Sequence, residues 1–252
     1  MILSSTILGS GNPLLILHGL FGESKNWNSI AKEMSSDFEV HLIDQRNHGN
    51  SFHHEEHNYA VLANDLYNYI NENSLQKYSI VGHSMGGKVA MQFSLMYPNE
   101  LQNLIIVDIA PKAYKNEHYA VFEGLQQVLL ESNSRKEAQN ILMHHVQDMT
   151  VVNFLLKGFS LSDSRKPQLK FNIQALEKNI TNLLGPLKKH NNFNGMTYFL
   201  SGSESNYIQP SDFKHISELF PRNKIITINN SGHWIHFEAK ESFLRTIKTI
   251  LK

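Results

Sequence analysis

Short, wholly apolar runs recur through the amino-terminal part of the chain, and each is followed by a stretch with helical periodicity. The expected strands are 14–17, 38–43, 77–82 and 104–107, and the expected helices between them are 26–34, 59–73 and 87–97. Apolar runs this short, without polar alternation, are typical of strands buried on both faces. Strands that alternate with helices at this spacing predict an α/β fold with a doubly wound, mostly parallel sheet.

The alternation stops after Pro111 and resumes at Thr197. Between them, apolar residues repeat every three or four positions, as in amphipathic helices, and no strand is expected. The strands expected after this region are 197–200 and 224–228, and the helices are 210–220 and 239–251. We therefore expect an α/β core of residues 1–111 and 191–252, with a helical cap inserted over residues 112–190. A plain additional layer of helices is the alternative.

Ser84 lies where an expected strand ends at Gly82 and an expected helix follows Gly87, in the pattern G-x-S-x-G. A serine on such a tight turn has strained backbone angles, and glycine is the residue that fits two positions before and after it. The turn exposes the hydroxyl at the amino end of a helix, where developing negative charge is favoured. The pattern predicts Ser84 as a nucleophile, the alternative being an ordinary glycine-rich turn.

A serine nucleophile needs a base, and histidine is the usual one near neutral pH. Of the 14 histidines, His233 is the expected base because it follows the last expected strand, at the same edge of the sheet as Ser84. His236 is its main competitor. The acid that orients the base is expected to be Asp108, which ends the strand after the nucleophile helix, with Glu204 as the alternative.

An oxyanion hole requires two backbone N–H groups that converge on one point. Met85, directly after the nucleophile, is expected to supply one of them. The glycine-flanked loop 18–22 is expected to supply the other, from Leu20 or, as a fallback, from Phe21. Main-chain donors leave the neighbouring side chains free to vary.

The remaining histidines near this edge are expected to have structural roles. His18, His48 and His83 lie in glycine-rich loops. The stretch 53–57, His-His-Glu-Glu-His, could be mistaken for a metal site. It lacks helical pairing at i, i+4 with a glutamate base, so a solvated loop is expected instead, and we expect no metal site.

Together these motifs resemble the α/β-hydrolase superfamily over nearly the whole chain and, within it, the esterase YbfF group. The matching stretches are Leu17–Gly22, Asp44–Gly49 with Ser51, Gly82–Lys88, Val107–Pro111 and Gly232–His236. The resemblance implies hydrolysis of acyl esters by Ser84 and His233 and supports Asp108 as the acid. It also implies that Ser205, at a position where related enzymes more often carry the acid, assists the site. We expect Phe21 and Trp234 to contact the substrate.

The leading expectation is a serine esterase, or an acyl-CoA thioesterase, that forms an acyl-enzyme on a small-molecule ester or thioester and needs no cofactor. A lyase or C–C bond hydrolase on the same residues is the alternative, and a non-enzymatic ligand receptor is a third reading. A haloalkane dehalogenase is disfavoured, because its nucleophile should be an aspartate at the position of Ser84. The expected cap contains 11 Lys and Arg residues and 7 Asp and Glu residues, and this excess of positive charge faintly favours anionic substrates such as acyl-CoA.

Composition narrows the partners and the compartment. Lys plus Arg equals Asp plus Glu at 23 each, so no global field recruits nucleic acid or a membrane surface. The absence of cysteine excludes disulfides and thiolate chemistry. We expect no transmembrane helix and no signal peptide, and hence a cytoplasmic location. The sequence contains no signal for an oligomeric state.

Overall fold

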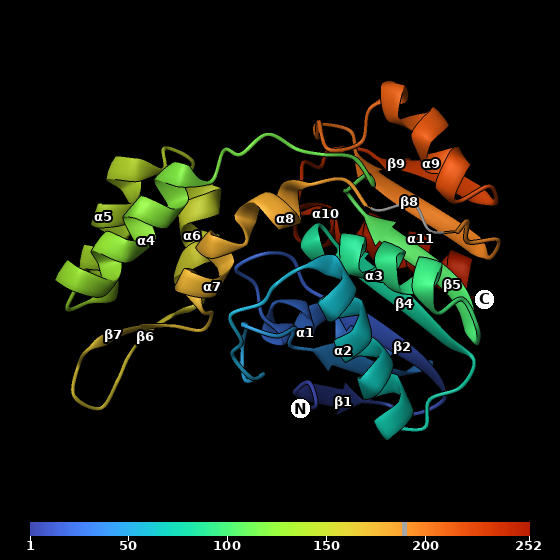
Figure 1. Cartoon of the computed structure of the whole chain (residues 1–252), viewed down its shortest axis with the longest axis horizontal. Helices are drawn as coiled ribbons and strands as arrows, with labels where there is room; N and C mark the ends of the chain where they lie inside the picture. Colours follow the sequence, from blue (N-terminus) through green and yellow to red (C-terminus); the bar gives the residue numbers. More distant parts are fainter. Residues whose placement is uncertain (188–190) are drawn as a thin grey trace.

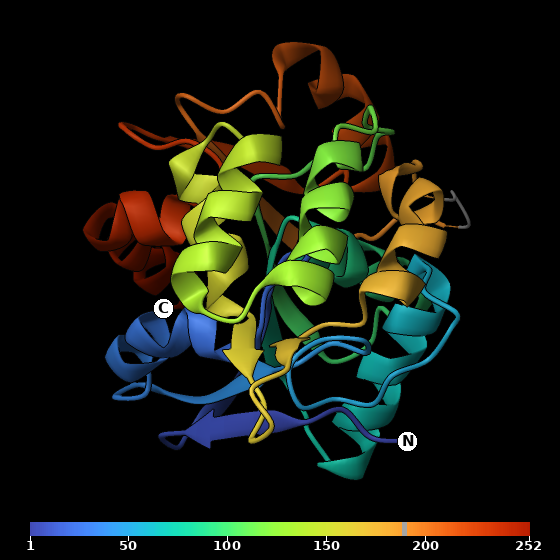
Figure 2. The same ribbon diagram turned by 90° about the vertical axis from the view of Figure 1, so that its left-hand side faces the viewer.

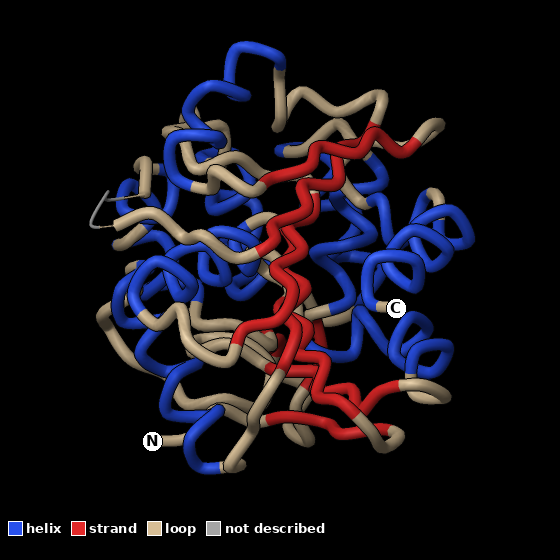
Figure 3. Tube along the Cα trace, turned by 90° about the vertical axis from the view of Figure 1, so that its right-hand side faces the viewer, coloured by secondary structure: helices blue, strands red, loops and turns tan. Residues whose placement is uncertain are grey.

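A seven-stranded sheet between helices forms the centre of the computed structural model, which describes residues 1–187 and 191–252 (Figures 1 and 3). In sheet order the strands are β1 (Ser5–Leu8), β3 (Phe38–Ile43), β2 (Asn12–Leu17), β4 (Tyr78–His83), β5 (Leu101–Val107), β8 (Met196–Gly202) and β9 (Asn223–Ile228). Neighbouring strands are parallel except for the antiparallel pair β1 and β3. The predicted mostly parallel, doubly wound sheet is confirmed.

Successive side chains of a strand point to opposite faces of the sheet, and both faces are apolar here. In β2, Leu15 and Leu17 belong to one buried cluster, whereas Leu14 and Ile16 belong to the other. The first face packs against α2 (Tyr59–Glu72), α3 (Met85–Met96) and α9 (Phe213–Leu219), and the second against α1 (Asn28–Met34), α10 (Ile235–Glu238) and α11 (Lys240–Leu251). Figure 3 shows helices on both sides of the sheet.

Residues 112–187, here called the helical segment, connect β5 to β8 and lie in front of the sheet in Figure 2. Its elements are α4 (Tyr119–Glu131), α5 (Arg135–His145), α6 (Met149–Lys157), β6 (Phe159–Leu161), β7 (Pro167–Leu169), α7 (Ile173–Lys178) and α8 (Ile180–Leu184). The expected absence of strands in this region is wrong, because β6 and β7 form an antiparallel hairpin. The expected cap boundary at residue 190 lies outside the described residues.

Two further elements were not expected from the sequence. The edge strand β1 pairs with β3 over four residues, too few for a periodic pattern to stand out. The short helix α10 begins two residues after His233, ahead of the expected carboxyl-terminal helix. In the part of the chain that the structure describes, no helix has both the length and the apolar character needed to cross a membrane.

Candidate active site

Ser84 stands between β4 and α3 on a strained turn, with φ of 52° and ψ of −118°. A Cβ on Gly86 would lie 2.5 Å from the carbonyl oxygen of His18, and a Cβ on Gly82 would overlap the Gly86 carbonyl. Strand, turn and helix therefore approach one another so closely that only glycine fits at both positions. This contact gives the G-x-S-x-G pattern its steric cause.

Asp108 follows β5 and is fully buried. Its carboxylate accepts three hydrogen bonds, from the Gly202 N–H at 3.1 Å, from the Ser205 hydroxyl and from Nδ1 of His233 at 2.8 Å. Because an ionised carboxylate only accepts, Nδ1 of His233 is the protonated ring nitrogen. Nε2 of the neutral ring is thereby left as a hydrogen-bond acceptor.

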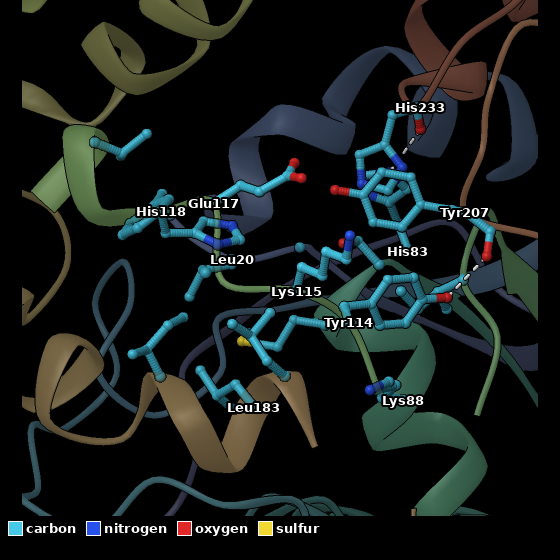
Figure 4. A pocket seen from close by; sticks show the side chains of 18 of the residues that line it. Leu20, His83, Lys88, Tyr114, Lys115, Glu117, His118, Leu183, Tyr207 and His233 are labelled. Atoms are coloured by element: carbon cyan, nitrogen blue, oxygen red, sulfur yellow. Dashed lines mark hydrogen bonds between the residues drawn. The ribbon is translucent and has the colours of Figure 1, made fainter. Parts of the chain in front are cut away.

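Two residues that the sequence analysis did not assign to the site hold His233 in place. The ring of Tyr207 stacks on the imidazole with 3.8 Å between ring centroids. Nε2 of His83, the residue before Ser84, donates to the main-chain carbonyl of His233 at 2.9 Å. Figure 4 shows Tyr207 against His233, with His83 beneath. Neither contact has a sequence signal, because each joins residues at the carboxyl ends of different strands.

The competing base and acid lie elsewhere. His236 is buried and stacks on Trp27 at 3.9 Å between ring centroids, and burial lowers its pKa to about 3. Glu204 is exposed to solvent, whereas Asp108 is the carboxylate within hydrogen-bond distance of His233. Ser84 and His233 line one cavity, although no hydrogen bond joins their side chains among the described residues.

This cavity has a volume of about 750 Å³ and lies between the strand-end loops and the helical segment (Figure 4). The core contributes the expected site residues Leu20, Phe21, Ser84, Met85, His233 and Trp234. The helical segment contributes a mainly apolar wall that includes Val121, Phe154, Leu155, Ile180, Leu183 and Leu184. A cavity with an apolar wall and a few convergent polar groups is typical of a small-molecule site.

The two residues expected to supply the oxyanion donors, Leu20 and Met85, line the same cavity. Met85 is the first residue of α3, so its N–H has no acceptor within the helix. The fallback donor, the N–H of Phe21, already donates to Nε2 of His48 at 3.2 Å. That bond, together with a φ of 61° at Phe21, positions the peptide that follows Leu20. The N–H of Leu20 is therefore the candidate partner of the Met85 N–H.

The histidines expected to be structural form buried hydrogen bonds between loops. Nε2 of His18 accepts from the Gln45 N–H at 3.1 Å. Nδ1 of His48 donates to the Arg46 carbonyl of its own loop at 3.0 Å, which leaves Nε2 to accept from the Phe21 N–H of the other loop. Burial lowers the pKa of both rings, which keeps them neutral and able to accept a hydrogen bond.

The histidine-rich stretch 53–57 is a loop, as expected, but one of its residues is not solvated. His57 is fully buried and contacts the Asn47 amide at 3.1 Å, and burial lowers its pKa to about 3. Within residues 1–187 and 191–252, no group of three or more His, Asp or Glu side chains is arranged to hold a metal ion.

Lys88 is a further cavity residue to which the sequence analysis gave no role, although the motif Gly82–Lys88 contains it. It lies on α3, and its side chain is buried. A sequence pattern does not distinguish a buried lysine from an exposed one on a helix.

Comparison with known proteins identifies the family. The family model described as the alpha/beta hydrolase fold matches residues 12–240. The sn-1-specific diacylglycerol lipase ABHD11 of Danio rerio is 34% identical over 254 residues, which cover 97% of this chain and 80% of that protein. Esterase YbfF of Escherichia coli is 29% identical over 244 residues, which cover 96% and 94% of the two chains.

A solved structure named Marine microorganism esterase superposes with a TM-score of 0.95 at 36% identity and covers 99% of both chains. This match and the family model confirm the fold that the strand and helix pattern predicts. The relatives also confirm the resemblance drawn from the five motifs. The chain therefore belongs to the α/β-hydrolase fold family, in the neighbourhood of the YbfF esterases.

Proposed function

We propose that this chain, a carboxylic ester hydrolase by its family and relatives, cleaves its substrate through Ser84, His233 and Asp108. The observation that carries the proposal is the 2.8 Å hydrogen bond from His233 Nδ1 to buried Asp108, in the cavity that Ser84 also lines. That bond selects the tautomer whose Nε2 can accept a proton from a hydroxyl. Ser205 supports the carboxylate through its hydroxyl hydrogen bond.

In the first half of the reaction, the Ser84 oxygen attacks the ester carbonyl carbon while His233 Nε2 takes the hydroxyl proton. The carbonyl oxygen becomes an oxyanion that accepts hydrogen bonds from the N–H groups of Leu20 and Met85. Donors of this kind are each worth about 3–4 kcal/mol of barrier. The tetrahedral intermediate then collapses, the bond to the leaving oxygen breaks, and His233 returns the proton to the departing alcohol.

In the second half, water attacks the Ser84 acyl-enzyme with His233 again acting as base. The acid is released and the Ser84 hydroxyl re-forms, so protons and electron pairs balance over the cycle. Neither half-reaction requires a cofactor. Asp108 stabilises the imidazolium that forms in each half-reaction, because the buried carboxylate accepts from Nδ1.

The helical segment forms the cap of the substrate cavity, and its apolar wall suits the acyl chain. Phe21 and Trp234 contact that chain or the leaving group, since both line the cavity. Thioesters are the second substrate class. Lys115 lines the same cavity, and its positive charge suits a phosphate-bearing leaving group such as coenzyme A. A cytoplasmic location stays a prediction.

Ser84→Ala tests the nucleophile directly. We expect hydrolysis of p-nitrophenyl acetate to fall by roughly 10⁵-fold or more, because the loss of a nucleophile disables the whole catalytic unit. A fluorophosphonate should add to the wild-type chain at Ser84, as measured by intact mass and peptide mapping, and leave the variant unlabelled. The control is Ser36→Ala, which changes an exposed serine on the surface and should leave both readouts unchanged.

Turnover retained in Ser84→Ala would refute the proposed nucleophile. Turnover in the wild type without a trapped adduct would favour the lyase alternative, in which His233 moves protons without covalent chemistry. Panels of oxyesters and acyl-CoA thioesters of increasing chain length then distinguish the two substrate classes. An oxyester and a thioester of the same length have the same acyl group and differ only in the leaving group.

A further inference from the structure

The helical segment leaves the core and returns to it along two connections that pair with each other. The Leu187 N–H donates to the Pro111 carbonyl at 3.0 Å. The Tyr114 N–H donates to the Leu184 carbonyl at 2.8 Å. The two connections therefore form a short antiparallel stem, through which the helical segment is attached to the core.

Lys88 joins this stem to the helix that begins directly after Ser84. Its Nζ donates to the Lys112 carbonyl in the first connection at 2.8 Å and to the Gly185 carbonyl in the second at 2.7 Å. One side-chain atom thus bonds both connections at the same level of the stem. Figure 4 shows Lys88 on α3, below Tyr114.

Among the described residues, no carboxylate contacts the Lys88 ammonium, although its side chain is 1% exposed. The rings of Tyr59 and Tyr114 lie 5.5 Å and 4.9 Å from Nζ, and the nearby Lys112 ammonium pairs with Asp212 at 2.6 Å. Burial lowers the pKa of Lys88 to about 7. Charged or neutral, Nζ has at least two N–H groups, enough for both carbonyls.

Both connections continue directly into the cavity wall. Leu183 and Leu184 precede Gly185 and line the cavity, as do Lys112 and Tyr114 on the other connection. On the core side, Lys88 lies four residues after Ser84, about one turn along α3. The Lys88 hydrogen bonds therefore set how far this wall stands from the nucleophile.

A second tie acts on the same wall from a different helix. The Tyr59 hydroxyl on α2 donates to the Leu183 carbonyl at 2.7 Å. Tyr59 bonds only the returning connection, whereas Lys88 bonds both. Lys88 is thus the residue that couples the spacing of the two connections to the position of α3.

We propose that Lys88 is a positioning residue that holds both connections of the helical segment against α3 and thereby fixes the part of the cavity that selects the acyl chain. The inference rests on the proposed esterase function. It assigns Lys88 no contact with the reacting atoms. Its loss should change the discrimination between esters more than the chemical step.

The test compares p-nitrophenyl acetate with p-nitrophenyl octanoate in the wild type and in Lys88→Met, which keeps the side-chain length and removes both donors. For octanoate we expect KM to rise about tenfold, because the wall that contacts the acyl chain is no longer held against α3 by the two Lys88 hydrogen bonds. For acetate, kcat should stay within about threefold, since Leu20, Met85 and His233 are held by other contacts. The ratio of kcat/KM for octanoate to kcat/KM for acetate, here called the ester ratio, should therefore fall about tenfold.

Lys178→Met is the matched control, because Lys178 also joins the helical segment to the core, through an exposed pair with Glu55 at 3.2 Å. An exposed pair of this kind contributes little, so the ester ratio should not change. An unchanged ratio in Lys88→Met, or an equal loss of kcat with both esters, overturns the positioning role. If the wild type hydrolyses neither ester, the proposed function fails instead.

Lys88→Arg covers the case in which Lys88→Met does not fold, as judged by circular dichroism. Its guanidinium keeps the charge and the donors, but it is bulkier than an ammonium and its N–H bonds lie fixed in one plane, so it cannot reproduce the two hydrogen bonds of Nζ. We expect the ester ratio to fall at least about threefold in this variant. A wild-type ratio in folded Lys88→Arg also contradicts the proposal.

Discussion

The strand-end loops and the helical segment both line the cavity, but they hold their residues in different ways. On the core side, Phe21, Ser84 and Asp108 have φ values of 61°, 52° and 50°, in the left-handed region. Among the described residues of the helical segment, only Arg165 in the hairpin turn has such a φ. A non-glycine residue in this region costs on the order of 1–3 kcal/mol.

The two sides of the cavity thus differ in how their residues are held. Three residues of the proposed catalytic site, Phe21, Ser84 and Asp108, are held by strained backbone, and contacts with neighbouring loops fix their directions. The wall of the helical segment consists of helices without strained backbone, whose apolar faces pack into the core cluster. Side chains of Lys88 and Tyr59 bond the stem that carries these helices. Substitutions on the core side should therefore affect turnover, whereas those on the helical side should affect which ester is preferred.

After removal of the proposed nucleophile itself, the largest effect is expected from Asp108→Asn. The amide cannot serve as the anionic acceptor of the His233 Nδ1–H, so the base loses its required tautomer and turnover should fall up to about 10⁴-fold. The measurement is kcat/KM for p-nitrophenyl acetate and octanoate. The value of kcat/KM should fall by the same factor for both esters, because the substitution is on the core side.

Glu204→Gln serves as the matched control for this prediction. Glu204 is exposed, on the loop after β8 that also carries Ser205, and its loss should change kcat/KM by less than about threefold. A larger loss in Glu204→Gln than in Asp108→Asn would reassign the acid.

An intermediate effect is expected where the two regions meet, in the pH dependence of stability set by Lys88. Its pKa falls from 10.5 to about 7 in the folded chain because burial penalises the charge. Between these values the unfolded chain binds more protons, so stability rises with pH. Below about pH 7 both states are protonated and the cost is fully present.

Urea unfolding of the wild type and Lys88→Met from about pH 6 to about pH 9 measures this contribution. The free energy of unfolding of the wild type minus that of the variant should increase above about pH 7. The slope of this difference should approach about 1.4 kcal/mol per pH unit. A difference between the two proteins that stays constant across this range would show that Lys88 does not lose its proton on folding.

The smallest effect is expected in the helical segment, from Phe154→Ala. Phe154 is half-buried, lines the cavity and packs on Trp234 with 5.6 Å between ring centroids. Loss of this apolar surface should raise KM for octanoate about fivefold, or about 1 kcal/mol, and leave kcat for acetate unchanged. Leu130→Ala, at an α4 residue that is 84% exposed, is the control. A fall in kcat for both esters would contradict the division between the two regions.

The sequence predicts those parts of the site that depend on contacts between near neighbours in the chain. Gly82 and Gly86 flank Ser84 because their missing Cβ atoms let strand and helix meet, and that requirement is visible in five consecutive residues. The sheet follows from apolar runs buried on both faces. The strand order β1-β3-β2-β4-β5-β8-β9, by contrast, is not predicted by these runs, because they do not indicate which strands are neighbours.

Contacts between distant residues have no such local pattern. The stacking of Tyr207 on His233 and the Lys88 hydrogen bonds to two carbonyls depend on how loops far apart in the chain meet. The hairpin of β6 and β7 pairs only three residues on each strand, fewer than a period-of-two pattern needs to be detected. His57 shows the same limit, since its burial follows from the Asn47 loop and not from its polar neighbours.

The hydrogen bond from His83 to the main chain of His233 has a mechanical consequence. His83 is covalently adjacent to Ser84, so a displacement of the end of β4 moves the hydroxyl and the imidazole-bearing loop in the same direction. The proposed nucleophile and the proposed base are thereby coupled through one side chain. A shift of β4 relative to its neighbours should change their separation less than it would without this bond.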